Sequence, residues 1–313
     1  QPLSLEKAQA LIEALSFDDA VKEEFLPALS NYIYQQHFDF ASNPLLLNML
    51  LITFDQVGSI PERMHIFYSQ AFEALVFKHD LLKSRYRRPQ KSGLEINTLR
   101  KVYAHFCANT YLKKTLSFSD SDLLDKLTKS LKFAGSNALP SELAHDLITC
   151  FSMLKRDGLR VTFVHRSFQE YFCALHILNT PLKYPRKAIE HIAAAPKSEQ
   201  AFSMLVDMSP EFVVREWALP FLIESAEFSG QCFKEGRFSL LASYLFRHFE
   251  VDDSGDEVII KFGTTKTYNQ LDSLEILAKN LEISELFENL NFPQMALSPE
   301  SSKALTESLA SLS

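Results

Sequence analysis

The chain has 313 residues, of which 46% are hydrophobic and 23% charged, and its formal net charge is −7 at pH 7. This composition is typical of a globular protein with two or three domains, and the negative charge disfavours nucleic acid as the partner of the whole chain. Four cysteines lie far apart without a CxxC pair, which favours reduced thiols over a disulfide framework or a zinc site. We therefore expect a cytoplasmic protein without a metal site.

The N-terminal region is predicted to be helical, because apolar residues recur at steps of three and four positions. Ser4 and Ser16 are suitable N-caps for the first two helices, and Pro27 predicts a kink or a restart in the second. Asn43 and Pro44 predict an N-cap followed by proline at the first helical position. The apolar run that follows is well short of the ~20 residues of a membrane span, so we expect no membrane insertion.

A turn at residues 58–61 precedes the next predicted helix. Further helices are expected to begin near Asn97 and at Ser119, where Ser119 and Asp122 match a capping box. Residues 155–164 combine an Asp-Gly turn with β-branched and aromatic residues, which predicts a β-hairpin. Three helices followed by a hairpin is the element order of a winged helix.

Beyond Asn179, X-Pro pairs divide the chain into helices of roughly ten to twenty residues with no fixed repeat. Residues 258–262 predict one strand of a small hairpin, with its partner near residues 264–268. The acidic residues around 250–257 are expected in a solvated loop. The small, polar tail from Ser298 is expected to be peripheral.

These elements predict a mainly α fold in three parts. We expect a first helical domain over residues 1–57 and a winged-helix domain with one hairpin wing over residues 58–178. A C-terminal helical domain with a small β-hairpin would occupy residues 179–313.

Several catalytic patterns are missing from the chain. It contains no GxxxxGK[ST], GxGxxG, HExxH or GxSxG, so we expect no catalytic residue within it. It also lacks a starting methionine, and we expect Gln1 to mark a cut inside a longer protein.

His165 stands where the predicted wing strand gives way to a helix, a place whose unpaired backbone amides favour an anion. Ser167 and Glu170 match a capping box, while Phe168 and Phe172 would line a buried helical face. From the residues alone, His165 is either a packed side chain or a donor to a phosphate group.

Residues 163–172 (FVHRSFQEYF) resemble the FxHxxFQE(F/Y) signature that closes the winged-helix domain of NACHT proteins, the NOD-like-receptor branch of the STAND NTPases. Residues 43–47 (NPLLL) resemble the proline motif of their first helical domain. Residues 2–8 (PLSLEKA) resemble a PLSxExA stretch that follows the nucleotide-binding core. The three motifs occur in the order of the family, and the resemblance covers residues 1–178.

The resemblance implies that His165 contacts the β-phosphate of ADP and that Pro44 packs near the adenine. It also implies a P-loop domain upstream of Gln1 in the same protein, which would bind ADP or ATP with Mg²⁺ and act as an ATPase. The present chain alone is not expected to hold nucleotide tightly.

The implied function is a nucleotide-dependent switch in antiphage or innate-immune-type defence. The winged helix would hold the ADP-bound closed state, and residues 179–313 would sense an unidentified trigger. Activation would produce a homo-oligomer.

Two alternatives remain open. Winged helices often bind DNA, and Arg85, Arg87 and Arg88 form a basic loop that could contact nucleic acid. A solvated connection is the simpler interpretation of that loop, given the acidic total charge. The chain could instead be a helical interaction scaffold, in which His165 has only a local packing role.

Overall fold

The computed structural model describes residues 2–61, 63–81, 90–194, 200–236, 249–252, 259–262, 273–274 and 276–281. Arg85, Arg87 and Arg88 lie outside these ranges, as does the tail from Ser298. Within them the protein is mainly helical and contains a small three-stranded antiparallel sheet, so the predicted fold class is confirmed. None of the helices described there combines the length and the apolarity that crossing a bilayer requires.

The chain divides into two compact units. Unit 1 comprises Gln1–Tyr103 and Leu116–Phe168, and unit 2 comprises Ala104–Thr115 and Gln169–Ser313. The domain boundaries at residues 57 and 178 remain predictions.

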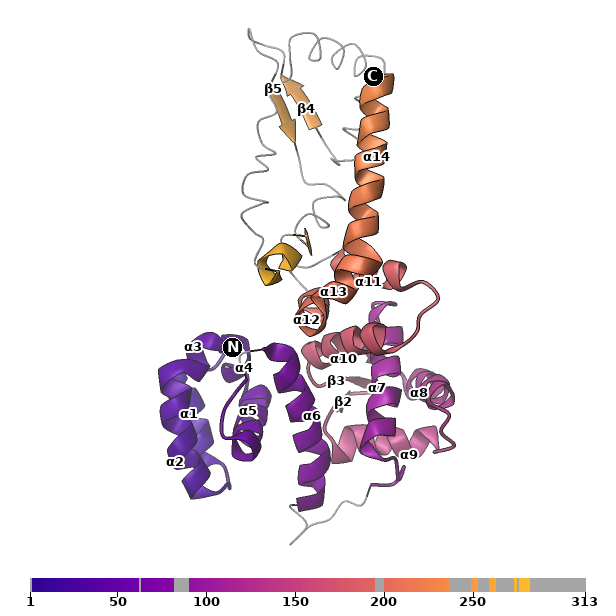
Figure 1. Cartoon of the computed structure of the whole chain (residues 1–313). Helices are drawn as coiled ribbons and strands as arrows, with labels where there is room; N and C mark the ends of the chain where they lie inside the picture. Colours follow the sequence, from indigo (N-terminus) through magenta and orange to yellow (C-terminus); the bar gives the residue numbers. More distant parts are fainter. Residues whose placement is uncertain are drawn as a thin grey trace. The chain divides into compact units, whose positions relative to one another are not determined.

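Unit 1 opens with the helices that the N-terminal periodicity predicts (Figure 1). They are α1 (Leu5–Ala14), α2 (Asp19–Ala28), the π-helical turn η1 (Leu29–Ile33), α3 (Tyr34–Gln36), α4 (Phe38–Ala41), α5 (Pro44–Val57) and α6 (Met64–Leu81). The most apolar of them, α5, lies against α1, α2, α4 and α6. Its side chains Leu46, Leu47 and Leu50 are buried, so this helix forms the centre of the first helical layer.

Two of the predicted helix starts form as expected. The Ser4 hydroxyl caps α1 by accepting the amide of Lys7 at 3.4 Å. The side-chain oxygen of Asn43 accepts the amide of Leu46 at 3.3 Å, and Pro44 is the first residue of α5. Proline fits this position because the first helical amide needs no partner within the helix.

The start of α2 differs from the prediction. Ser16 does not cap this helix, because the carboxylate of Asp18 accepts the amide of Ala20 at 2.9 Å and the helix begins after it. Pro27 lies inside α2, which ends one residue later and passes directly into η1. The wider π-helical turn takes the place of a break at the proline.

The rest of unit 1 has the element order of a winged helix. The elements are α7 (Ile96–Tyr111, of which the part after Tyr103 belongs to unit 2), β1 (Ser117–Phe118), α8 (Asp120–Ala134), α9 (Pro140–His145), the π-helical turn η2 (Asp146–Cys150), β2 (Leu154–Asp157) and β3 (Arg160–Phe163). Strand β3 lies between β1 and β2 and is antiparallel to both.

The predicted hairpin over residues 155–164 is confirmed as β2 and β3. Asp157 pairs with Arg160, which leaves Gly158 and Leu159 as a two-residue loop. Gly158 has a φ of +58°, and a positive φ at the first loop position is what a type II′ turn requires. The turn therefore lies one residue later than the Asp-Gly pair suggests.

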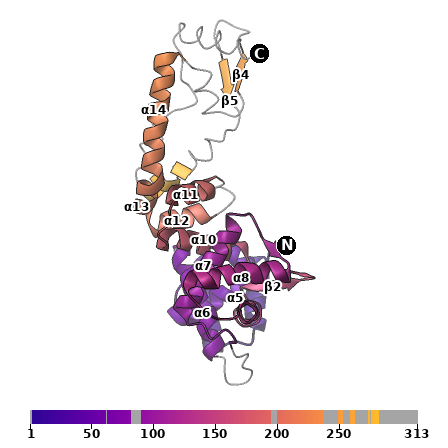
Figure 2. The same cartoon turned by 90° about the vertical axis from the view of Figure 1, so that its right-hand side faces the viewer.

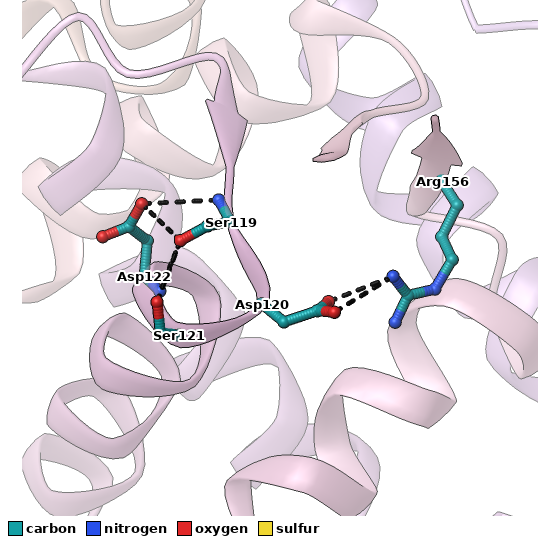
Figure 3. A network of polar contacts seen from close by, with 5 residues as sticks. All are labelled: Ser119, Asp120, Ser121, Asp122 and Arg156. Atoms are coloured by element: carbon teal, nitrogen blue, oxygen red, sulfur yellow. Dashed lines mark hydrogen bonds and ion pairs between the residues drawn. The ribbon is translucent and has the colours of Figure 1, made fainter. Parts of the chain in front are cut away.

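The capping box at the start of α8 also forms as predicted (Figure 3). The Ser119 hydroxyl accepts the amide of Asp122 at 3.2 Å, and the Asp122 carboxylate accepts the amide of Ser119 at 3.4 Å. Hydrogen bonds from the hydroxyl and the amide of Ser119 lower the pKa of the Asp122 carboxyl. Asp120 pairs with Arg156 of β2 at 3.1 Å, which ties the start of α8 to the wing.

Unit 2 is built from helices. They are α10 (Arg166–Asn179, in unit 2 from Gln169), α11 (Pro185–Ala193), α12 (Ala201–Met208), α13 (Pro210–Val213), the π-helical turn η3 (Val214–Ala218) and α14 (Leu219–Glu235). Of these, α11 and α13 begin at the proline of a predicted X-Pro pair. Trp217 is fully buried, stacks on Phe221 with ring centroids 5.8 Å apart, and meets Phe202 edge-on. This aromatic group joins α12, η3 and α14.

The small hairpin of unit 2 confirms one predicted strand. Strand β5 (Ile259–Phe262) pairs antiparallel with β4 (Phe249–Asp252), as Figure 2 shows. The second strand predicted at residues 264–268 lies outside the described ranges. The sequence FEVD alternates apolar and acidic residues, which is a strand pattern that its acidic content disguises.

A pair of histidines lies in unit 2, between α7 and α10. The rings of His105 and His176 meet edge-on with centroids 5.3 Å apart, and Nδ1 of His176 lies 3.1 Å from the Thr180 hydroxyl. Burial, aided by the neighbouring His105, lowers the pKa of His176 from 6.5 to about 4. Burial also lowers the pKa of His105.

We expect His176 to make the stability of the fold depend on pH. Because its folded pKa of about 4 lies below the ordinary 6.5, the unfolded chain binds this proton more tightly. The stabilisation is complete above about pH 6.5 and is lost as the pH falls towards 4, with a ceiling of about 3 kcal/mol. The substitution His176→Phe should flatten this part of the curve, measured as the free energy of unfolding in urea at each pH.

The matched control is His191→Phe, which changes an exposed histidine of α11. This variant should keep the slope of the unchanged protein. Equal slopes for the unchanged protein and His176→Phe across the same pH range would contradict the assignment.

Candidate functional site

The candidate site is the corner at which strand β3 ends and helix α10 begins. His165 is the residue just before α10, and its carbonyl oxygen accepts the amide of Phe168 at 3.3 Å. Its ring nitrogen Nδ1 accepts the amide of Ser167, also at 3.3 Å, and lies against the Ser167 hydroxyl. The half-buried imidazole of His165 therefore caps the first turn of α10.

The capping box predicted for this helix is wrong. Ser167 lies inside the first turn of α10, because the ring of His165 reaches the first free amides before a serine cap can form. The carboxylate of Glu170 accepts the amide of Gln200 at 3.3 Å, within unit 2. Glu170 thus supports the start of α12.

Gln169 of the same stretch also has a packing role in unit 2. Gln169 is fully buried, and its side-chain amide donates to the Thr110 hydroxyl at 2.9 Å and to the carbonyl of Thr115 at 3.2 Å. Phe172 and Cys173 are fully buried, and the thiol forms no disulfide, as predicted. Within this stretch, His165 caps helix α10 at the corner. The residues from Gln169 onward pack within unit 2.

Within unit 1, residues of two of the three motifs contact the segment just before the motif at residues 43–47. The ring of His165 lies 6.4 Å from that of Phe40, which belongs to α4. Two residues later, the carbonyl of Ser42 accepts the amide of Leu3 at 2.7 Å. The motifs at residues 2–8, 43–47 and 163–172 are therefore brought to the same region by α4 and the turn after it.

An aromatic cluster holds this region together. Phe40 meets Phe67 and Tyr68 of α6 edge-on, with ring centroids 5.0 and 5.4 Å apart. Tyr68 meets Phe168 of α10 at 5.1 Å. Phe40, Phe67, Tyr68 and Phe168 are buried, so helices α4, α6 and α10 are coupled through them beside His165.

Pro44 is exposed at the start of α5, where it initiates the helix. Its packing near an adenine remains a prediction.

His37, which the sequence did not single out, is buried between α3 and α4, and burial lowers its pKa. Phe40 was missed as well, because a buried phenylalanine of a short helix gives no sequence signal beyond core packing.

Two cations of the β2–β3 hairpin have partners within unit 1. Arg156 pairs with Asp120, and Arg160 donates to the hydroxyl and carbonyl of Ser117. Nucleic-acid contact through Arg85, Arg87 and Arg88 remains a prediction, since these residues lie outside the described ranges.

A second group of polar side chains lies at the end of α9. One ligand-type atom from each of His145, Asp146 and Cys150 lies within 4.8 Å of the others. The two carboxylate oxygens of Asp146 already accept the amides of Lys91 and Ser92 at 2.9 and 2.8 Å. Asp146 is fully buried, so the geometry assigns it to anchoring the segment before α7.

A pocket of about 310 Å³ lies in unit 2, at the end of α10. It contains none of the predicted site residues. The lining side chains are Leu178, Asn179, Thr180, Pro181, Leu182, Pro185, Phe212 and Glu216. Two of the polar side chains already have partners, because Glu216 pairs with Arg215 at 2.8 Å and the Thr180 hydroxyl lies 3.1 Å from Nδ1 of His176.

The chain was compared with protein-family models and with curated proteins. No protein-family model matches the chain, and a search of curated proteins returns no match. The interpretation of the site therefore depends on its own geometry and on the three motifs.

We expect Asp146→Ala to lower the free energy of unfolding by roughly 2–4 kcal/mol, because the amides of Lys91 and Ser92 lose their buried acceptor. The matched control is Cys150→Ala, in the same turn, which should cost less than about 1 kcal/mol. Urea unfolding measures both. An equally small loss for the two variants would show that Asp146 is not an anchor.

Proposed function

We propose that this chain is the regulatory part of a NACHT-type STAND NTPase, a nucleotide-dependent signalling switch. The observation that carries the proposal is a pair of contacts, the ring of His165 against Phe40 and the Leu3 amide on the Ser42 carbonyl. These contacts bring His165 and Leu3 to the segment that leads into the motif at residues 43–47.

His165 suits the role of a phosphate ligand on a mobile domain. It would donate to the β-phosphate of ADP, which a P-loop domain upstream of Gln1 would hold together with Mg²⁺. Pro44 would lie near the adenine. Because a ligand shifts a conformational equilibrium only by binding the two states differently, a histidine contact made only in the closed state stabilises that state.

Release of this contact would allow the domains to separate and the protein to form a homo-oligomer. Residues 179–313 would sense the trigger, and the biological setting would be cytoplasmic antiphage or innate-immune-type defence. The proposal requires a GxxxxGK[ST] pattern in the native reading frame upstream of Gln1.

The experiment compares two substitutions of His165 in the native protein that contains this chain. His165→Gln keeps a donor near the position of Nε2, whereas His165→Asn keeps a polar atom near Nδ1 and leaves nothing at Nε2. We expect ADP release to be roughly 10- to 100-fold faster in His165→Asn and close to normal in His165→Gln. Release is followed with a fluorescent ADP analogue.

In the helical-scaffold alternative only the helix cap at Nδ1 matters, so the order of the two variants is reversed and is seen in stability. His165→Asn, which keeps a polar atom near Nδ1, would then keep the normal free energy of unfolding, and His165→Gln would lower it. Unchanged ADP release in both variants would refute the switch proposal. Salt-dependent DNA binding that is lost when Arg85, Arg87 and Arg88 are neutralised would instead favour the nucleic-acid alternative.

A further inference from the structure

We infer that Ser167 is the positioning residue of His165, because it directs two donors at Nδ1 and thereby leaves the imidazole proton on Nε2. This inference rests on the proposed function, in which Nε2 is the atom that faces the phosphate. The capping-box interpretation made Ser167 only the N-cap of α10, whereas here Ser167 orients the imidazole of His165.

The tautomer follows from the direction of one hydrogen bond. The amide of Ser167 lies 3.3 Å from Nδ1 of His165, and a backbone amide can only donate. This hydrogen bond requires Nδ1 to accept, so we assign Nδ1 as the nitrogen without a proton. Since a neutral imidazole has one N–H group, that group is at Nε2.

The hydroxyl of the same serine reinforces this arrangement. Its oxygen lies against Nδ1, and with Nδ1 as an acceptor the hydroxyl must be the donor. Ser167 is only 5% exposed, so packing limits the rotation of its hydroxyl. Two donors from one residue define the plane of the ring more closely than a single hydrogen bond does.

Phe40 completes the positioning. Its ring lies 6.4 Å from that of His165 at an angle of 40° and is itself held by the aromatic cluster. The imidazole is therefore oriented by Ser167 at Nδ1 and flanked by an aromatic ring. The chemical result is an oriented neutral N–H donor at Nε2, a group that can bind an anionic oxygen.

The test uses the native protein, labelled with ¹⁵N-histidine and studied by magic-angle-spinning NMR. The signals of His165 are assigned from the spectrum of His165→Gln. We expect the unchanged protein to show a protonated Nε2 and an unprotonated Nδ1. Ser167→Ala keeps the amide donor but loses the hydroxyl donor, so we expect a minor second population with the proton on Nδ1, and Ser167→Thr, which keeps both donors, should restore the original signals.

The second readout is ADP release, which should be about 3- to 10-fold faster in Ser167→Ala than in Ser167→Thr. The control Ser119→Ala removes the cap of α8 but should change neither the His165 signals nor ADP release.

A proton on Nδ1 in the unchanged protein overturns the inference, as does an unaltered spectrum in Ser167→Ala. A spectrum that changes in Ser167→Ala while ADP release stays normal in both Ser167→Ala and His165→Asn gives a separate result. It supports the positioning of His165 and overturns the proposed function.

Discussion

The corner between β3 and α10 depends on the hydrogen bond from the amide of Ser167 to Nδ1 of His165. This bond starts the helix, orients the imidazole and places its ring against Phe40. Because Phe40 lies in the aromatic cluster with α6, the same bond links the winged-helix end of unit 1 to its first helical layer. This geometry brings the motif at residues 163–172 to the segment that leads into the motif at residues 43–47.

Histidine is an unusual choice for such a cap. Serine, threonine, aspartate and asparagine are the favoured residues at the start of a helix, and the structure uses Ser4, Asp18 and Ser119 in that way elsewhere. A histidine adds a second nitrogen on the far side of the ring, which no shorter cap provides. The proposed function gives this second nitrogen a phosphate ligand.

Local patterns of the sequence predict much of the secondary structure, and two capping boxes show the limit of that approach. Ser119 with Asp122 and Ser167 with Glu170 look equivalent as patterns, yet only the first one forms. The difference lies in the residue two positions earlier, because the ring of His165 reaches the amide of Ser167. A capping-box pattern begins at Ser167 and therefore does not include His165, whose ring accepts the Ser167 amide.

Other differences arise from long-range pairing. The strand at β5 is visible from its β-branched residues, but its pairing with β4 depends on contacts that periodicity does not encode. Likewise, nothing in the local sequence indicates that Phe40 meets His165. The residue types of the candidate site were therefore predictable from the motifs, whereas its aromatic partner and the role of Ser167 required the fold.

The central claim is that Nε2 of His165 donates a hydrogen bond to the β-phosphate of ADP. The most direct measurement is a crystal structure of the native protein, containing this chain and the expected P-loop domain, with ADP bound. The account predicts Nε2 within about 2.7–3.2 Å of a β-phosphate oxygen, with Nδ1 still on the amide of Ser167. An ADP molecule bound without contact to His165 would contradict it.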